Sequence, residues 1–202
     1  MDTAMLVHLV EDDENVRCSL AFLLRSAGYK SEMYPDGQEF LQRIGTDSEG
    51  VVLLDIRLGE QDGLSVHEEM IRRNINLPVV ITTGHGDVST AVRAMKNGAR
   101  DFLEKPYDDE VLFTILERLA AERAGQAGQT GAQARQLLTR LSPREHQVLD
   151  GLLDGYQNKT IAYNLGLSTR TVEMHRTHLM KKLGTRTLSS TLSIGIAARD
   201  AV

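Results

Sequence analysis

The sequence predicts a doubly wound α/β domain with a five-stranded parallel sheet, followed by a small all-α domain of four helices. Short apolar runs alternate with helical patterns over residues 1–122, as they do in doubly wound sheets. Residues 123–138 turn to Ala, Gly and Gln, with one Thr, which is a linker composition. Residues 139–202 show helical patterns alone. We therefore expect two domains, 1–122 and 139–202, joined by that linker.

Five segments of the first domain are expected to form strands. Met5–Val10, Val51–Ile56 and Pro78–Thr83 are short apolar runs, as expected for parallel strands that are covered on both faces. Phe102–Leu103 is a shorter fourth candidate. The more polar segment Lys30–Tyr34 fits only an edge strand.

Helices are expected between these strands and throughout the second domain. Val16, Leu20, Leu23 and Leu24 recur at helical spacing and form one apolar face. Ser142 begins a later helix, because proline and, three residues on, glutamate follow it in the pattern of a capping box. The remaining helices are expected around residues 40–44, 64–71, 88–97, 108–122, 158–165, 169–183 and 188–198.

The composition argues against several classes of protein. The chain is 41% hydrophobic and 25% charged, which argues against wholesale disorder. No apolar run approaches the roughly 18 residues that a membrane helix needs. The N-terminal residues lack the basic region of a signal peptide. The single cysteine, Cys18, cannot build a disulfide framework. We expect a cytoplasmic protein with no membrane partner.

The net charge of −5 hides an asymmetry between the two predicted domains. Residues 1–122 carry 12 Lys and Arg against 23 Asp and Glu, whereas residues 139–202 carry 9 against 5. A basic second domain indicates an anionic partner for that end of the chain.

Polar residues follow the predicted strands and should meet at one edge of the sheet. Glu11 and Asp12 follow the first strand, Asp55 and Thr83 lie near the ends of the third and fourth, and Lys105 follows the fifth. In open α/β sheets, ligands bind at this carboxyl edge. Three carboxylates in one crevice repel each other and suit a hard cation such as Mg²⁺. A carboxylate beside a metal, a hydroxyl and a lysine can attack phosphorus and form an aspartyl phosphate.

Several ordered motifs resemble the receiver domains of two-component response regulators, and the FixJ-like subfamily in particular. They are Leu9–Asp13, Leu53–Arg57, Thr83–Asp87, Ala94–Ala99 and Asp101–Pro106. The resemblance implies a flavodoxin-like fold. It also implies that a partner sensor histidine kinase phosphorylates Asp55.

The resemblance further implies how this pocket is used. Asp12 would bind Mg²⁺ directly, Glu11 through water and Arg57 through its backbone carbonyl, and Asp55 would be a further ligand. Thr83 and Lys105 would contact the phosphoryl group. Thr83 would also form a switch with an aromatic residue, Phe102, that moves when phosphate binds. The peptide bond between Lys105 and Pro106 would be cis.

Two residues depart from the family's pattern. Glu11 replaces the commoner aspartate, which keeps the charge and lengthens the side chain. Gly59 replaces the proline that usually follows the third strand. We expect a looser loop at Gly59.

The second domain resembles the LuxR/FixJ-type helix-turn-helix, through Leu141–Glu145, Asn158–Ala162 and Ser168–Arg176. The resemblance implies a regulator that binds promoter DNA. Glu173, Met174 and Thr177 would then face base edges. Other residues at or near the expected recognition helix, residues 169–183, would contact DNA, mostly at phosphates. They are Lys159, Thr169, Arg170, His175, Arg176, Lys181 and Lys182.

Phosphorylation should convert a mostly monomeric protein into a homodimer, because one short recognition helix makes too few base contacts for selective binding. The face that carries Val92, Met95, Leu103 and Tyr107 is the candidate surface. RNA polymerase is a further expected partner.

Two alternatives to this interpretation involve different classes of protein. A haloacid-dehalogenase-type enzyme also uses a nucleophilic aspartate, but it needs a second aspartate two residues later, where this chain has Arg57. The other alternative is a phosphate sink or protein-interaction regulator whose helical domain does not bind DNA. The basic second domain argues against it, and a gel-shift experiment would distinguish the two. A nucleotide hydrolase is not expected, because no Walker-type glycine-rich lysine motif occurs.

Overall fold

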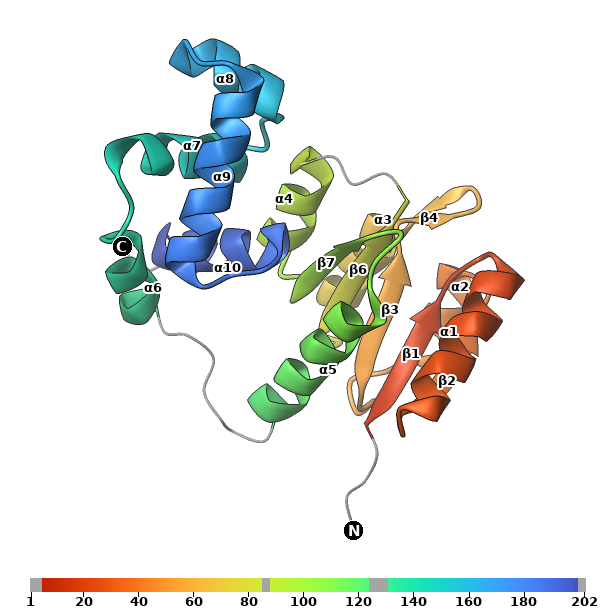
Figure 1. Ribbon diagram of the computed structural model, residues 1–202. Coiled ribbons are helices and arrows are strands. Elements are labelled where there is room, and N and C mark those ends of the chain that lie inside the picture. The colour runs from red at the N-terminus through yellow and green to blue at the C-terminus, as the bar shows by residue number, and fades with distance from the viewer. Residues whose placement is uncertain (1–4, 85–87, 124–130, 200–202) are drawn as a thin grey trace. The chain divides into compact units, whose positions relative to one another are not determined.

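The computed structural model describes residues 5–84, 88–123 and 131–199. Its contacts divide the chain into two compact units: Met1–His85 with Asn97–Ala124, and Gly86–Lys96 with Gly125–Val202. Figure 1 shows a sheet in the first unit and helices in the second. Among the described residues, no helix combines the length and the apolar character needed to cross a membrane.

The first unit contains a five-stranded parallel sheet, as predicted. In spatial order its strands are β2 (Lys30–Tyr34), β1 (Leu6–Val10), β3 (Val51–Asp55), β6 (Val79–Thr83) and β7 (Asp101–Glu104). β2 lies at an edge, where its polar residues were expected. Every residue of the central strand β3 is buried. Because β1 pairs with β2 on one side and β3 on the other, the strand order reverses there, and ligands of open α/β sheets bind at the carboxyl edge beside such a reversal.

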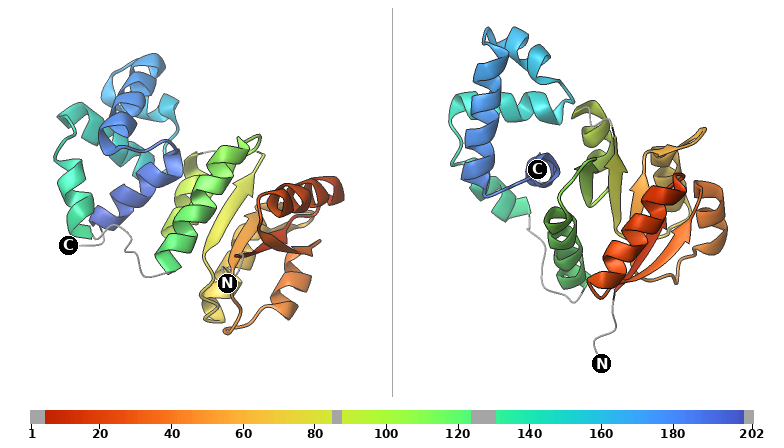
Figure 2. Two further views of the ribbon diagram at one scale, coloured as in Figure 1. Left: turned by 60° about the horizontal axis from the view of Figure 1, so that its bottom comes forward. Right: turned by 45° about the vertical axis from the view of Figure 1, so that its right-hand side comes forward.

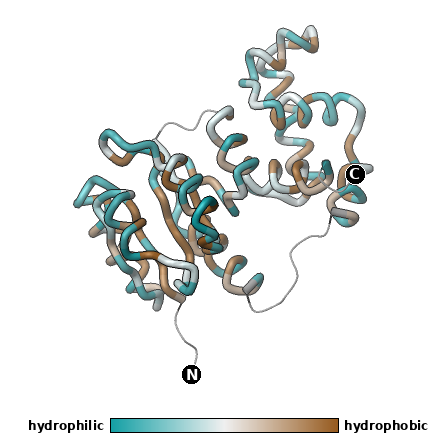
Figure 3. Tube along the Cα trace, turned by 180° about the vertical axis from the view of Figure 1, so that it is seen from behind, coloured by the Kyte–Doolittle hydropathy of each residue, from teal (hydrophilic) through white to brown (hydrophobic). Residues whose placement is uncertain are grey.

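Helices cover both faces of this sheet, as Figure 2 shows. α1 (Glu14–Ser26) and α5 (Asp109–Arg123) pack on one face, and α2 (Gly37–Arg43) and α3 (Gly63–Arg72) lie on the other. Leu24 of α1 and Leu112 and Leu116 of α5 are fully buried against the strands. The hydropathy colours of Figure 3 show the same layering, with hydrophobic strands between helices whose outer faces are hydrophilic.

A short antiparallel ribbon that the sequence did not indicate follows β3. It consists of β4 (Arg57–Leu58) and β5 (Gln61–Asp62). Gly59 turns the chain between them with φ +62°, a conformation that favours glycine. The Asp62 side chain then accepts from the Leu64 N–H and caps α3.

The second unit is helical, and its capping residues match the prediction. Its helices are α4 (Val88–Lys96), α6 (Gly131–Leu138), α7 (Pro143–Leu153), α8 (Asn158–Leu165), α9 (Thr169–Leu183) and α10 (Leu188–Arg199). Ser142 and Glu145 form the predicted capping box at the start of α7. Gly166 makes the turn between α8 and α9 with φ +65°, and Ser168 caps α9.

Helix α6 lies within the segment 123–138 that was expected to be a linker. The glycines of that segment suggested an irregular chain, but residues 132–138 are Ala, Gln, Arg and Leu, which favour helix. Ala134 is fully buried, and α6 packs on α10. The structured helical part therefore begins before residue 139.

Candidate phosphoacceptor site and nucleic-acid interface

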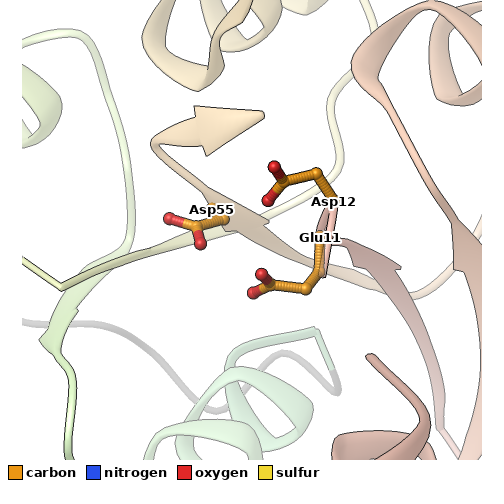
Figure 4. Close-up of side chains that lie close together, drawn as sticks. All are labelled: Glu11, Asp12 and Asp55. Carbon is orange, nitrogen blue, oxygen red and sulfur yellow. The ribbon is translucent and has the colours of Figure 1, made fainter. Parts of the chain in front are cut away.

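Three carboxylates converge at the carboxyl edge of the sheet. Glu11 and Asp12 directly follow β1, and Asp55 is the last residue of β3. One oxygen from each lies within 4.8 Å of the others, as the arrangement in Figure 4 illustrates. Glu11 and Asp55 are buried, whereas Asp12 is exposed. The pocket therefore has a buried floor and one side chain that faces solvent.

Lys105 bridges the two buried carboxylates. Its Nζ donates to Glu11 Oε2 at 2.5 Å and to Asp55 Oδ2 at 2.6 Å. Burial raises the pKa of Glu11, although the Lys105 hydrogen bond opposes this. Burial alone would lower the pKa of Lys105, but its bonds to Asp55 and Glu11 outweigh burial and raise the pKa. The lysine therefore stays cationic and partly offsets the charge of the pocket. The Lys105–Pro106 peptide bond is cis, as expected.

Backbone donors from the ribbon contact two further carboxylate oxygens. The Arg57 N–H donates to Asp55 Oδ1 at 3.2 Å, and the Gly59 N–H donates to Asp12 Oδ2 at 3.0 Å. The structure thus differs from the looser loop expected at Gly59. Proline has no N–H, so the replacement of proline by glycine supplies a donor that ties the loop to Asp12.

The donor set of this pocket fits a hard divalent cation. Its ligating atoms are carboxylate oxygens, which Mg²⁺ prefers in proteins. Three carboxylates exceed the single ammonium of Lys105 in charge, so the site retains an attraction for a cation. Arg57, whose carbonyl was expected as a further ligand, lies two residues after Asp55 on β4.

The two predicted switch residues lie on neighbouring strands. Thr83 ends β6 and is buried, and its carbonyl accepts from the Lys105 N–H at 2.7 Å. Phe102 lies on β7 with 8% of its surface exposed. His85, within the Thr83–Asp87 motif, lies outside the described residues. Thr83 therefore contacts Lys105 through the backbone of the neighbouring strand, and Phe102 precedes Lys105 by three residues in the chain.

Residues expected at a dimer surface are mostly buried. Leu103 belongs to the core between the sheet, α1 and α5. Val92 and Met95 are also buried, and Tyr107 is half-buried. Leu103 in particular packs in the core and is not exposed at a surface in this structure.

Helix α9 has the orientation that the sequence predicted. Val172, Leu179 and Leu183 are buried. Glu173 and Met174 are exposed, as is Thr177, with 48% of the Met174 surface accessible. The hydroxyl of Thr177 donates to the Glu173 carbonyl at 3.0 Å. An exposed methionine flanked by polar groups is available for a partner, and its contact with bases stays a prediction.

The residues expected at DNA phosphates fall into two groups. Lys159, Arg170, Lys181 and Lys182 are exposed, as is Thr169. His175 and Arg176 are half-buried. Arg176 and Lys182 have partners within the protein that the sequence did not indicate. Arg176 Nη1 donates to Asn158 Oδ1 at 3.1 Å, and Lys182 Nζ donates to Glu145 Oε2 at 2.7 Å.

Two residues beside the acidic pocket were not assigned to it from the sequence. Arg17 donates to the backbone of the Glu11–Asp12 corner. Gly63 packs so tightly that an added Cβ would lie 2.0 Å from the Asp55 carbonyl oxygen. The position of Gly63 after a capping aspartate was the only available signal, and nothing in the sequence marked Arg17.

Comparisons with known proteins match both halves of the chain. Residues 7–117 match the response regulator receiver domain, and residues 139–193 match the bacterial regulatory proteins of the luxR family. The transcriptional regulatory protein FixJ of Rhizobium meliloti is 39% identical over 199 residues, which cover 96% of this chain and 97% of that protein. The tetrathionate response regulatory protein TtrR of Salmonella typhimurium is 39% identical over 178 residues, which cover 88% of this chain and 85% of that protein.

A solved structure agrees with these relatives. Full-length FixJ from B. japonicum is 38% identical and matches 97% of this chain and 98% of its own, with a TM-score of 0.56. These relatives are regulators rather than enzymes. The chain therefore belongs to the two-component response regulators, as a FixJ-like transcriptional regulator with a receiver domain and a LuxR-type DNA-binding domain.

Proposed function

We propose that a sensor histidine kinase phosphorylates Asp55, and that the phosphorylated protein dimerises and binds promoter DNA in the cytoplasm. The observation that carries this proposal is the Lys105 bridge between Glu11 and Asp55 at the strand-order reversal. The bridge brings the acceptor carboxylate, a cation and Glu11 together, and Asp12 lies beside them in the same pocket. This is the chemical equipment that phosphoryl transfer to a carboxylate needs.

The transfer step follows from these residues. A carboxylate oxygen of Asp55 attacks the phosphorus of the kinase phosphohistidine, and the bond from phosphorus to the imidazole nitrogen breaks. Asp12, Asp55 and the Arg57 carbonyl would hold Mg²⁺, with Glu11 contributing through water, and the bound ion would neutralise charge on the phosphoryl oxygens. Lys105 is already within hydrogen-bonding distance of Asp55 and can move its donor to a phosphoryl oxygen. Thr83 would donate its hydroxyl to another.

The readout is proposed to begin at Thr83 and Phe102. Movement of the Thr83 hydroxyl toward the phosphoryl group would leave space that Phe102 can enter. This local change would favour a homodimer, and two recognition helices would then bind two half-sites. Contact with RNA polymerase would complete transcriptional control. The exposed face of α9 supports the DNA-binding part of the proposal.

The phosphoacceptor is tested by Asp55→Asn. Incubation with acetyl phosphate and Mg²⁺ should label the wild-type chain with acid-labile phosphate and leave Asp55→Asn unlabelled. Asp13→Asn is the matched control, because Asp13 is a neighbouring carboxylate that caps α1 and asparagine is also a good cap. Undiminished label on Asp55→Asn would contradict the proposed site.

A further inference from the structure

Arg17 contacts the backbone of Glu11 and Asp12, which we call the acidic corner. It lies in the first turns of α1, and its Nη1 donates to the Glu11 carbonyl at 2.6 Å and to the Asp12 carbonyl at 3.2 Å. One guanidinium nitrogen carries two hydrogens, so it can serve both carbonyls at once. Within the described residues, Arg17 forms no salt bridge with a carboxylate. Its charge is directed to the backbone of two residues whose side chains form the pocket.

Other contacts leave the corner little freedom. The Glu11 N–H donates to the Tyr34 carbonyl at 3.2 Å, which fixes the chain where it leaves β1. The Asp12 side chain is tied to Gly59. Arg17 supplies the remaining restraint, because it orients the two peptide carbonyls between these points. Without it, the partly buried carbonyl of Glu11 would lose a charge-assisted partner and the corner could rotate.

We infer that Arg17 is a positioning residue that fixes the backbone of Glu11 and Asp12 so that their carboxylates are arranged for Mg²⁺ before the ion binds. The inference rests on the proposed Mg²⁺-dependent function of this pocket. By this inference, a residue of α1 that is not itself a metal ligand orients two residues that are. Partners of this kind, one shell beyond the ligands, commonly change metal affinity by about 10–100-fold.

The sign of the effect distinguishes positioning from charge. Arg17 is a cation close to the pocket, so its field alone would repel Mg²⁺. If charge were its only influence, Arg17→Met should bind Mg²⁺ more tightly. If Arg17 positions the corner, Arg17→Met should bind Mg²⁺ more weakly, by about 10-fold. The two readings therefore predict opposite changes.

The experiment is a calorimetric Mg²⁺ titration of the full-length chain, without any phosphoryl donor. Arg25→Met is the matched control: Arg25 is exposed on the same helix, eight residues or about 12 Å further along its axis. We expect Arg25→Met to stay within about twofold of wild type and Arg17→Met to lose about 10-fold. Arg17→Lys, which keeps the charge and one donor group, should recover part of the loss.

Each outcome has a defined meaning. Arg17→Met affinity equal to or tighter than that of Arg25→Met overturns the inference. Circular dichroism in the presence of EDTA checks that each variant is folded. If Arg17→Met does not fold, Arg17→Lys against Arg25→Lys decides, and equal affinities overturn the inference. A wild-type chain that fails to bind Mg²⁺ at all would instead contradict the proposed function.

Discussion

The acidic pocket and the predicted recognition helix, α9, are built in different ways. The pocket joins residues that are distant in sequence: Lys105 is 94 residues from Glu11 and 50 from Asp55. The exposed face of α9 comes from one helix, whose ends are defined locally by Ser168 and Gly184. The pocket therefore depends on the packing of the whole sheet, whereas the α9 surface depends on one helix being oriented correctly. A change beside the pocket should affect both fold and chemistry, and a change on the exposed face of α9 should affect binding alone.

Gly63→Ala should produce the largest effect and tests this dependence most severely. The new Cβ would lie 2.0 Å from the Asp55 carbonyl oxygen, so the strand or α3 must move. We expect a loss of about 3 kcal/mol in the free energy of unfolding, at the upper end for overpacking, together with slower phosphorylation. Gly45→Ala is the control, because its added Cβ meets nothing within 4 Å. Urea unfolding checks the prediction, and equal stability of the two variants would contradict tight packing behind Asp55.

Glu145→Gln tests the ion pair between Glu145 and Lys182, which are 37 residues apart in the helical unit. Burial raises the pKa of Glu145, but bonds from Lys182 and Ser142 outweigh burial and lower it to about 2 from its ordinary 4.5. A carboxyl with a lowered pKa stabilises the fold above about pH 4.5, and that stabilisation is lost as the pH falls toward 2.

We therefore expect Glu145→Gln to lower the free energy of unfolding at pH 7 by about 1–3 kcal/mol, as for a lost charged hydrogen bond. The difference from wild type should shrink below pH 4.5. Urea unfolding at pH 7 and pH 3 measures it. A difference that does not depend on pH would show that the Lys182 pair is not its source.

Exposed residues of α9 should change DNA binding without changing stability. Lys181 is exposed, and Lys181→Ala should weaken binding to every sequence and reduce the salt slope by about one unit. Glu173→Ala should instead alter the preferred sequence, at a cost of about 1–3 kcal/mol for a lost base contact. Sequence selection at two salt concentrations distinguishes them. An unchanged sequence preference for Glu173→Ala would mean that this face of α9 does not read bases.

The difference between long-range contacts and local features also explains what could be predicted from the sequence. Strands such as Val51–Asp55 and caps such as Ser142 carry local signals in hydrophobic periodicity and residue type. The pocket acids were predictable because parallel strands end at one edge of the sheet. Arg17 and the Glu145–Lys182 pair were not, because a side chain's partner across 6 or 37 residues depends on packing that no local pattern records. Helix α6 was missed because the three glycines of the segment 123–138 suggested an irregular chain.

The central claim is that the state of Asp55 in one unit governs DNA binding through the other. Its most direct test is sedimentation and operator binding of the full-length chain, with and without beryllofluoride and Mg²⁺, beside Asp55→Asn. We predict that beryllofluoride doubles the molecular mass of the wild type and tightens its binding, and leaves Asp55→Asn unchanged. An unchanged mass together with unchanged operator affinity for the wild type would contradict the claim.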